Sequence, residues 1–528
     1  MRNTFQHFIL LGLLTLVVAG CQAPDGDIYI LYENDVHCAV DGYEKMAALR
    51  ADYLKKSIYV NVVSCGDFVQ GDKAGSISKG RYPVALMNAV PYDYVTLGNH
   101  EFDYGMPQLR KLMWWMRAKV LCCNFSYVST GKQLYRAYHV RSYGSRKVAF
   151  IGVATPESLT SSVPTNFQNE DGEWEYSFHA DEVAELVQQA VNSAKEEGAE
   201  YVIVLSHLGD DTRGINSVDL IHQTEGIDVV LDGHAHHVIN RKMADLNGDS
   251  VLLASTGCKF QYIGRLLIDL QGKVSNELIN METYQGTNPR MRSRIDNIKE
   301  KVSEKTNKLI GFSQIKLTDS DDNNNRLVRY QETNLCNFVA DAMRVVTKAD
   351  IGVSNAGGIR GSLPAGQLTY GDLMQVLPFN NSIYQIRLTG KQMVNALEIG
   401  ARALPKESGD LLHTSGLRYT INATIPTSVH LDENGMCDSI GVTRRVSGVE
   451  VEKDGLWVPI DTNAVYTVGG QNYMLVCGGG SGMFNGTEEV PTEHIPDVDA
   501  LVKYIQILGD TIRANQYGTT QQRLNINN

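Results

Sequence analysis

Several short segments of this chain place His, Asp or Asn side chains directly after runs of apolar residues. Imidazole nitrogens together with carboxylate and amide oxygens suit Mn, Fe, Co, Zn or Ni, and they disfavour copper(I) and iron–sulfur centres. The strongest segment is Gly-Asn-His-Glu-Phe-Asp at 98–103, because Asn, His and Asp together after a strand have few structural uses. These residue types predict a site for divalent metal ions. The candidate ligands are Asp35, His37, Asp67, Asn99, His207, His234 and His236, with His100 and Asp103 beside them.

The apolar runs that precede these residues are typical of buried strands. They are short, rich in β-branched and aromatic residues, and end at Gly, Asn, Asp, Pro or His. Helical patterns lie between them, at 43–55 and 181–197 among others. Strands that alternate with helices predict an α/β layered domain, and its strand ends can gather distant residues into one pocket. The predicted strands are 28–32, 58–64, 92–97, 148–153, 201–206 and 228–232.

The ordered series Asp-x-His, Gly-Asp, Gly-Asn-His-Glu, His and Gly-His-x-His resembles the calcineurin-like metallophosphoesterase family, and more closely its bacterial 5'-nucleotidase branch. The resemblance covers nearly the whole mature chain. It implies a β-sandwich flanked by helices, followed by a second α/β domain, the 5'-nucleotidase C-terminal domain. It also implies two divalent ions: Asp35, His37 and His236 would hold one, Asn99, His207 and His234 the other, and Asp67 would bridge both.

The resemblance gives His100 a catalytic role rather than a ligand role, with Asp103 orienting its ring. Two divalent ions ~3.5–4 Å apart share a water and lower its pKa, which supplies a hydroxide nucleophile near neutral pH. The same ions offset the charge that develops on phosphate oxygens in the transition state. The implied reaction is the release of phosphate from nucleotides.

A second motif, Asn355-Ala-Gly-Gly-Ile-Arg360, follows a predicted strand in the C-terminal half. Glycine allows close backbone approach to a ligand, and arginine offers a fork for phosphate or carboxylate. The motif resembles the signature of the 5'-nucleotidase C-terminal domain. In that domain Arg329 matches another substrate-binding arginine, and Phe379 matches one of two aromatic residues that sandwich the nucleobase. The resemblance therefore implies that Arg329, Asn355, Arg360 and Phe379 bind substrate.

The chain departs from the family where a second aromatic residue and a ribose-binding Asp are expected. By the simplest match Leu475 and Ser481 stand there, and Tyr473 could substitute only if the backbone shifts. A serine cannot accept a pair of ribose hydroxyls as a carboxylate does. This departure keeps two alternatives open: a 2',3'-cyclic-nucleotide or nucleotide-sugar phosphodiesterase, and a phosphatase of a non-nucleotide ester. A separate alternative of a different class is a non-catalytic surface lipoprotein that only binds.

The predicted organisation has a signal peptide at 1–20, a metallophosphoesterase domain at 27–290, a linking helix at 291–310 and a C-terminal domain at 311–515. The linking segment is charged, carries Ile and Val at helical spacing, and lacks Gly and Pro. An alternative is that it forms one more helix of the first domain. By resemblance, it could serve as a hinge between the domains.

The first residues predict export. An apolar run at 9–19 follows Arg2 and is shorter than the ~20 residues that a membrane-spanning helix needs. The segment Val-Ala-Gly-Cys that ends at Cys21 resembles a bacterial lipobox, in which the signal is cut before the cysteine and the thiol is lipidated. An ordinary signal peptide is the alternative. We therefore expect a protein anchored by lipid in the bacterial cell envelope, in the periplasm or at the outer membrane.

The overall charge excludes one class of partner. Forty-eight Lys and Arg against 60 Asp and Glu give a net charge of −12, which disfavours a nucleic-acid polymer. A small anionic substrate is still compatible, because bound metal ions invert the local sign of the charge. The expected partner is a small phosphorylated molecule, most plainly a nucleotide, and the oligomeric state is left open.

Overall fold

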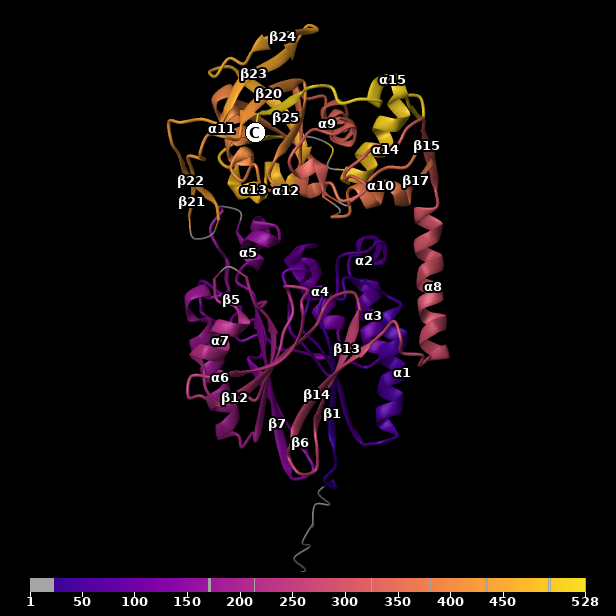
Figure 1. Cartoon of the computed structure of the whole chain (residues 1–528), viewed down its shortest axis with the longest axis vertical. Helices are drawn as coiled ribbons and strands as arrows, with labels where there is room; N and C mark the ends of the chain where they lie inside the picture. The colour runs from indigo at the N-terminus through magenta and orange to yellow at the C-terminus, as the bar shows by residue number, and fades with distance from the viewer. Residues whose placement is uncertain are drawn as a thin grey trace, which may run out of the picture.

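The computed structural model describes residues 23–169, 172–212, 214–323, 325–379, 381–432, 435–491, 493 and 495–527. The predicted signal peptide and Cys21 lie outside these residues. Two lobes follow one another along the long axis of the molecule, and the N-terminal lobe is the lower one in Figure 1. Within the described residues, no helix combines the length and the apolar character needed to cross a membrane.

Two six-stranded sheets form the centre of the N-terminal lobe, as expected for a β-sandwich. The first has the order β14 (Val274–Asn280), β13 (Tyr262–Ile268), β1 (Ile28–Glu33), β2 (Tyr59–Ser64), β3 (Tyr94–Val95), β4 (Lys119–Val120). The second has the order β11 (Val238–Ala244), β12 (Ser250–Thr256), β10 (Val229–Leu231), β9 (Tyr201–His207), β7 (Arg146–Ala154), β6 (Tyr138–Tyr143).

The alternation of side chains along β1 explains the layers. Ile28, Ile30 and Tyr32 pack between the two sheets, while Tyr29 and Leu31 point the other way, toward helices. The helices on that side are α1 (Gly42–Leu54), α3 (Arg81–Ala89) and α4 (Met106–Trp115). Helices α6 (Val183–Glu196) and α7 (Ser217–Gln223) cover the outer face of the second sheet. The result is a sandwich flanked by helices.

Parallel pairing brings the candidate ligands to one edge. Strands β1, β2 and β3 are parallel neighbours, and so are β7, β9 and β10. The segments that follow these strands therefore leave their sheets in the same direction. The predicted strand at 92–97 is the least accurate of the set, because only Tyr94–Val95 pairs as β3 and the polar segment begins directly after it.

Helix α8 (Pro289–Thr306) runs along the side of the molecule from one lobe to the other. Its apolar residues Met291, Ile295 and Ile298 belong to the core of the N-terminal lobe. The helix ends before the predicted limit of 310, because Leu309–Ser313 already forms strand β15 of the next lobe.

The C-terminal lobe is built on a five-stranded sheet. Its order is β19 (Leu412–Ser415), β16 (Ile351–Asn355), β25 (Val465–Gln471), β18 (Ile383–Thr389), β26 (Glu488–Val490). Helix α9 (Asn334–Thr347) buries one face against this sheet. Thr389 caps α11 (Gly390–Ala401) in a capping box with Gln392.

Candidate active site

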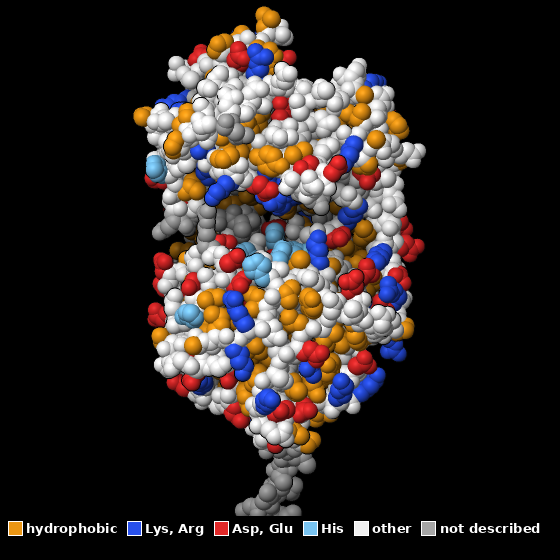
Figure 2. All heavy atoms as spheres, in the orientation of Figure 1, with side chains coloured by type: hydrophobic (Ala, Val, Ile, Leu, Met, Phe, Trp, Pro, Cys, Tyr) orange, Lys and Arg blue, Asp and Glu red, His pale blue; other side chains and the backbone are white. Residues whose placement is uncertain are grey.

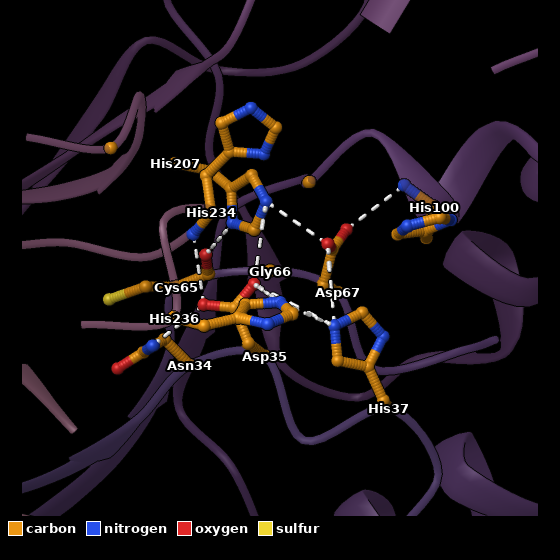
Figure 3. A network of polar contacts seen from close by, with 12 residues as sticks. Asn34, Asp35, His37, Cys65, Gly66, Asp67, His100, His207, His234 and His236 are labelled. Atoms are coloured by element: carbon orange, nitrogen blue, oxygen red, sulfur yellow. Dashed lines mark hydrogen bonds and ion pairs between the residues drawn. The ribbon is translucent and has the colours of Figure 1, made fainter. Parts of the chain in front are cut away.

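The predicted ligands meet at the sheet edge that faces the C-terminal lobe. Figure 2 shows histidine side chains gathered beside the cleft between the lobes, and Figure 3 shows how the rings and carboxylates point toward one another. Within each of three groups, potential ligand atoms lie within 4.8 Å of one another. These groups are Asp35, His37 and His236; Asp67, His207 and His234; and His37, Asp67 and His100.

Hydrogen bonds fix the orientation of two of the rings. His207 Nδ1 lies 2.6 Å from the Cys65 carbonyl oxygen, and His37 Nδ1 lies 3.1 Å from the carbonyl oxygen of Gln70. A carbonyl oxygen only accepts, so Nδ1 carries the proton in both rings. Nε2 of each ring therefore presents a lone pair to the site.

The two carboxylates are also held by hydrogen bonds. Asp35 Oδ2 accepts from the backbone N–H of His234 at 2.9 Å, and Asp67 Oδ1 accepts from the backbone N–H of His100 at 2.9 Å. Asp67 Oδ2 lies 3.2 Å from Nε2 of His207. Each carboxylate thus has one oxygen held by the backbone and another turned toward imidazoles.

Buried polar atoms without hydrogen-bond partners indicate the kind of ligand that this site fits. Among the described residues, three buried candidate ligand atoms have no hydrogen-bond partner: Asp35 Oδ1, Asn99 Oδ1 and His207 Nε2. An unsatisfied buried polar group costs about 1–3 kcal/mol. His37 Nε2 and His236 Nε2 are 2.9 Å apart, and ligands bound at 2.0–2.2 Å to one ion lie about 3 Å apart. The residues present therefore fit divalent metal ions.

The backbone of the ligand loops is bent in an unusual way. Asp35, His37, Asp67, His234 and His236 all have positive φ, between 44° and 78°. Non-glycine residues rarely adopt this left-handed conformation, and such strain clusters at functional sites. At Gly98 a side chain is excluded altogether, because a Cβ atom would lie 2.1 Å from Asp67 Oδ1.

Glu101 is a positioning residue that the sequence analysis did not single out. Its buried carboxylate accepts backbone N–H groups of Asp67 and Phe68 at 2.8 Å, of Val69 at 3.2 Å and of Gly98 at 2.6 Å. One side chain thereby ties the loop after β2 to the loop after β3. The signal was present, since Glu101 is the Glu of the Gly-Asn-His-Glu segment.

Glu157 was also missed. It follows β7, and its carboxylate lies 3.1 Å from Nε2 of His234. A carboxylate opposite one ring nitrogen makes that nitrogen the donor and leaves the other nitrogen for a metal. No motif in the sequence pointed to this residue.

His100 and Asp103 form a hydrogen-bonded pair in which Nδ1 of the histidine lies 2.7 Å from Asp103 Oδ2. The hydroxyl of Ser162 donates to the other carboxylate oxygen at 3.2 Å. Burial disfavours the charged imidazole, but the carboxylates of Asp103 and Asp67 outweigh it and raise the pKa of His100 to about 9. These two carboxylates therefore favour the protonated form of the ring.

A cavity of about 370 Å³ connects this pair to the C-terminal lobe. Asn99, His100 and Asp103 line it from the N-terminal lobe. Asn355, Arg360 and Phe379 line it from the C-terminal lobe, together with Asp410 and Tyr473. The structure thus brings together three of the four residues expected to bind substrate.

Arg329 is not among the residues that line this cavity. It lies 3.9 Å from the carboxylate of Glu407. Burial, followed by the charges of Arg326 and Arg360, lowers the pKa of Arg329 to about 10. Arg329 thus lies near two other arginines, Arg326 and Arg360, and near the carboxylates of Glu407 and Asp410.

The structure distinguishes Leu475 from Tyr473 as the residue at the second aromatic position. Helix α12 (Asn472–Leu475) turns Leu475 into the apolar core, where it is 3% exposed, and leaves Tyr473 lining the cavity. Tyr473, and not Leu475, therefore places an aromatic ring at this cavity.

Two family models match this chain. The calcineurin-like phosphoesterase model matches residues 28–238, and the model of the 5'-nucleotidase C-terminal domain matches residues 310–486. The chain belongs to the 5'-nucleotidase branch of the calcineurin-like phosphoesterases. Members of the calcineurin-like family use divalent metals.

Individual 5'-nucleotidase relatives are distant. The chain is 24% identical over 542 residues to the trifunctional nucleotide phosphoesterase protein YfkN of Bacillus subtilis. The matched region covers 94% of this chain and 35% of that protein. The chain thus spans about a third of that relative's length. It is 25% identical over 486 residues to a 5'-nucleotidase of Vibrio cholerae, which covers 80% of this chain and 84% of that one. The fold matches the crystal structure of a 5'-nucleotidase precursor from Thermus thermophilus with a TM-score of 0.70, 24% identity and coverage of 95% and 99%.

Proposed function

We propose that this chain is an exported, two-metal phosphoric ester hydrolase that releases phosphate from nucleotides. The observation that carries the proposal is the shared cavity: the His100–Asp103 pair and the candidate ligand Asn99 face the same space as Arg360 and Phe379. A substrate in that space can contact the reacting groups and an arginine at once.

Each set of residues has a distinct role in this proposal. Asp35, His37 and His236 would hold one ion and Asn99, His207 and His234 another, with the Asp67 carboxylate between the two sets. Divalent ions in these positions would activate water and offset charge on the phosphate group. Arg360, with Arg329 nearby, attracts the substrate anion. The aromatic ring of Phe379 offers a face on which a flat base can stack.

His100 serves as the proton donor of the proposed reaction. Its Nδ1 proton is held by Asp103, so Nε2 is the atom that can donate to the phosphate or the leaving oxygen. The carboxylates of Asp103 and Asp67 raise the pKa of His100 and so favour the protonated ring. Ser162 restrains Asp103 and thereby the plane of the ring.

The test is phosphate release by protein stripped of metal and reloaded with Mn, Co or Zn. The panel contains 5'-mononucleotides, 2',3'-cyclic nucleotides, nucleotide sugars and simple phosphate esters. We expect 5'-mononucleotides to give the highest kcat/KM. Absence of turnover on every ester, with bound metal verified by elemental analysis, would refute the hydrolase.

A phosphodiesterase acting on cyclic nucleotides or nucleotide sugars is the second candidate. The observation that favours it is Ser481, which replaces a carboxylate expected in the nucleoside site. The same panel separates the two candidates by the order of their kcat/KM values.

Export through a lipidated Cys21 is a further part of the proposal, supported by the Val-Ala-Gly-Cys segment after an apolar run. Intact-mass analysis of the membrane fraction should find an acylated N-terminal cysteine. Recovery of the native protein without acylation would contradict this part and leave the hydrolase untouched.

A further inference from the structure

We infer that Asp410 is a specificity-determining residue that accepts hydrogen bonds from hydroxyl groups on the alcohol part of the substrate. The inference rests on the proposed function and names its substrate class: phosphate esters of alcohols that carry neighbouring hydroxyls, as a ribose does. No sequence motif marks Asp410, which precedes strand β19.

The two oxygens of Asp410 have different surroundings. Oδ2 pairs with the guanidinium of Arg402 at 2.5 Å and accepts the hydroxyl of Ser481 at 3.3 Å. No described residue donates to Oδ1, and the side chain retains 18% exposure in the cavity wall. An ionised carboxylate oxygen can only accept. A ligand group that binds Oδ1 is therefore a donor, as a hydroxyl is, and not a fully ionised phosphate.

The loop that carries Asp410 is fixed in place by the Asn355–Arg360 motif. The backbone N–H of Gly357 and the side-chain amide of Asn355 both donate to the Gly409 carbonyl, at 2.7 and 3.1 Å. A Cβ atom at position 357 would lie only 3.0 Å from that oxygen, a contact tighter than most, so glycine favours this close approach. Asn355 thus acts by positioning this loop, which holds the Asp410 carboxylate ready for a ligand.

Ser481 ties Asp410 to the position at which the sequence lacks a carboxylate. Ser481 has φ of 59°, a left-handed conformation within a glycine-rich turn, and this brings its hydroxyl to Asp410. The carboxylate missing at 481 is therefore supplied from another strand end. Tyr473 lines the same cavity and supplies the aromatic surface that Leu475 does not.

The experiment compares three substrates on Asp410→Asn and Asp410→Ala: adenosine 5'-monophosphate, its 2',3'-dideoxy analogue and p-nitrophenyl phosphate. We expect kcat/KM for the hydroxyl-bearing nucleotide to fall about ten- to hundredfold, mainly through KM, as for a lost hydrogen bond to a charged group. The other two substrates should change less than about twofold, since they offer no donor to that oxygen. Glu450→Gln removes an equivalent charge, paired with Arg418 elsewhere in the lobe, and is the matched control.

A double variant separates binding from a structural role. The double variant Asp410→Ser with Ser481→Asp exchanges the two side chains of this contact, so that position 481 carries the carboxylate. We expect it to recover part of the kcat/KM that the single Asp410 variants lose on the hydroxyl-bearing nucleotide. Equal losses on all three substrates, or unchanged kinetics on the nucleotide, would overturn the inference.

A binding measurement keeps this inference separate from the proposed reaction. Calorimetry with adenosine and 2',3'-dideoxyadenosine needs no turnover. Adenosine should bind wild-type protein more tightly than its dideoxy analogue, and Asp410→Asn should remove the difference. An equal affinity in the wild type would overturn the role of Asp410 even if phosphate release is observed. Failure of all turnover with this difference intact would refute only the proposed reaction.

Discussion

At the scale of single residues, the site is shaped by which atoms are held and which are left unpaired. Backbone groups occupy Asp35 Oδ2 and Asp67 Oδ1. Among the described residues, Asp35 Oδ1 and His207 Nε2 have no hydrogen-bond partner and lie only at ion-pair distance from other site residues. Such pairing prepares ligand atoms before any ion arrives. The types of the candidate ligands could be read from the sequence. Which oxygen or nitrogen of each side chain faces the site could not, because that depends on neighbours up to 199 positions away.

His100→Ala tests the division between ligands and the proton donor. Loss of a positioned general acid typically lowers turnover by about 10²–10⁴-fold. We expect such a fall in kcat with metal content unchanged by elemental analysis. His430→Ala, on an exposed position of β21 (Val429–Leu431), is the control and should leave both quantities unaltered. Loss of metal together with activity would mean that His100 is a ligand, as its grouping with His37 and Asp67 allows.

Glu101→Gln tests the tie between the two ligand loops. A glutamine oxygen can replace only part of an acceptor that serves four backbone N–H groups, and its amide adds a donor that faces other donors. We expect the free energy of unfolding to fall by about 2–4 kcal/mol in urea titrations. Metal affinity, measured by competition with a chelator, should fall as well. Unchanged stability and affinity would show that Glu101 does not position these loops.

At the scale of elements, parallel strands place the ligand loops at one edge, and the loops then reverse sharply. Five of the candidate ligands have left-handed backbones, and Gly98 leaves room for the Asp67 carboxylate.

In the other lobe, α14 (Asp497–Ile507) begins with a buried carboxyl that faces Gln471 at the end of β25. Burial raises the pKa of Asp497 to about 7.

The raised pKa of Asp497 predicts a pH dependence of stability. Below about pH 4 the carboxyl group is protonated in both the folded and the unfolded states, so it adds no pH dependence to the free energy of unfolding. Between about pH 4 and 7 the unfolded state releases the proton while the folded state keeps it, so this group makes stability fall as pH rises. Asp497→Asn should remove that part of the decline when urea unfolding is compared at pH 5 and pH 7. Asp438→Asn, at an exposed position, should keep the wild-type slope; an unchanged slope in Asp497→Asn would contradict the prediction.

At the scale of the whole molecule, the cavity belongs to neither lobe alone. Its wall combines His100 and Asp103 with Arg360 and Phe379, and Ser76 donates to the Pro378 carbonyl across the lobes at 3.0 Å. Helix α8 packs on the N-terminal lobe and leads into the C-terminal one. The relative position of the lobes therefore sets which residues share the cavity.

A disulfide between the lobes tests whether turnover requires them to move. Paired cysteines at the Ser76–Pro378 contact, with Ser76→Cys as one of the two, would hold the lobes together when oxidised. We expect kcat to fall strongly in the oxidised form and to recover on reduction. The single Ser76→Cys variant is the control. Undiminished turnover of the fully oxidised protein would count against a hinge motion.

The residue types of the candidate metal site and the class of fold could be predicted from local sequence patterns alone. The evidence for both was local: the types of the candidate ligands, their order after apolar runs, and the Asn355–Arg360 motif. Local patterns of this kind can be recognised without knowing how the chain packs. The tertiary structure decided what depends on long-range contact: the unpaired atoms, the tie made by Glu101, and the exchange of Leu475 for Tyr473. It also brought Asp410 beside Ser481, because two segments 71 positions apart in the chain meet only when the lobe has folded.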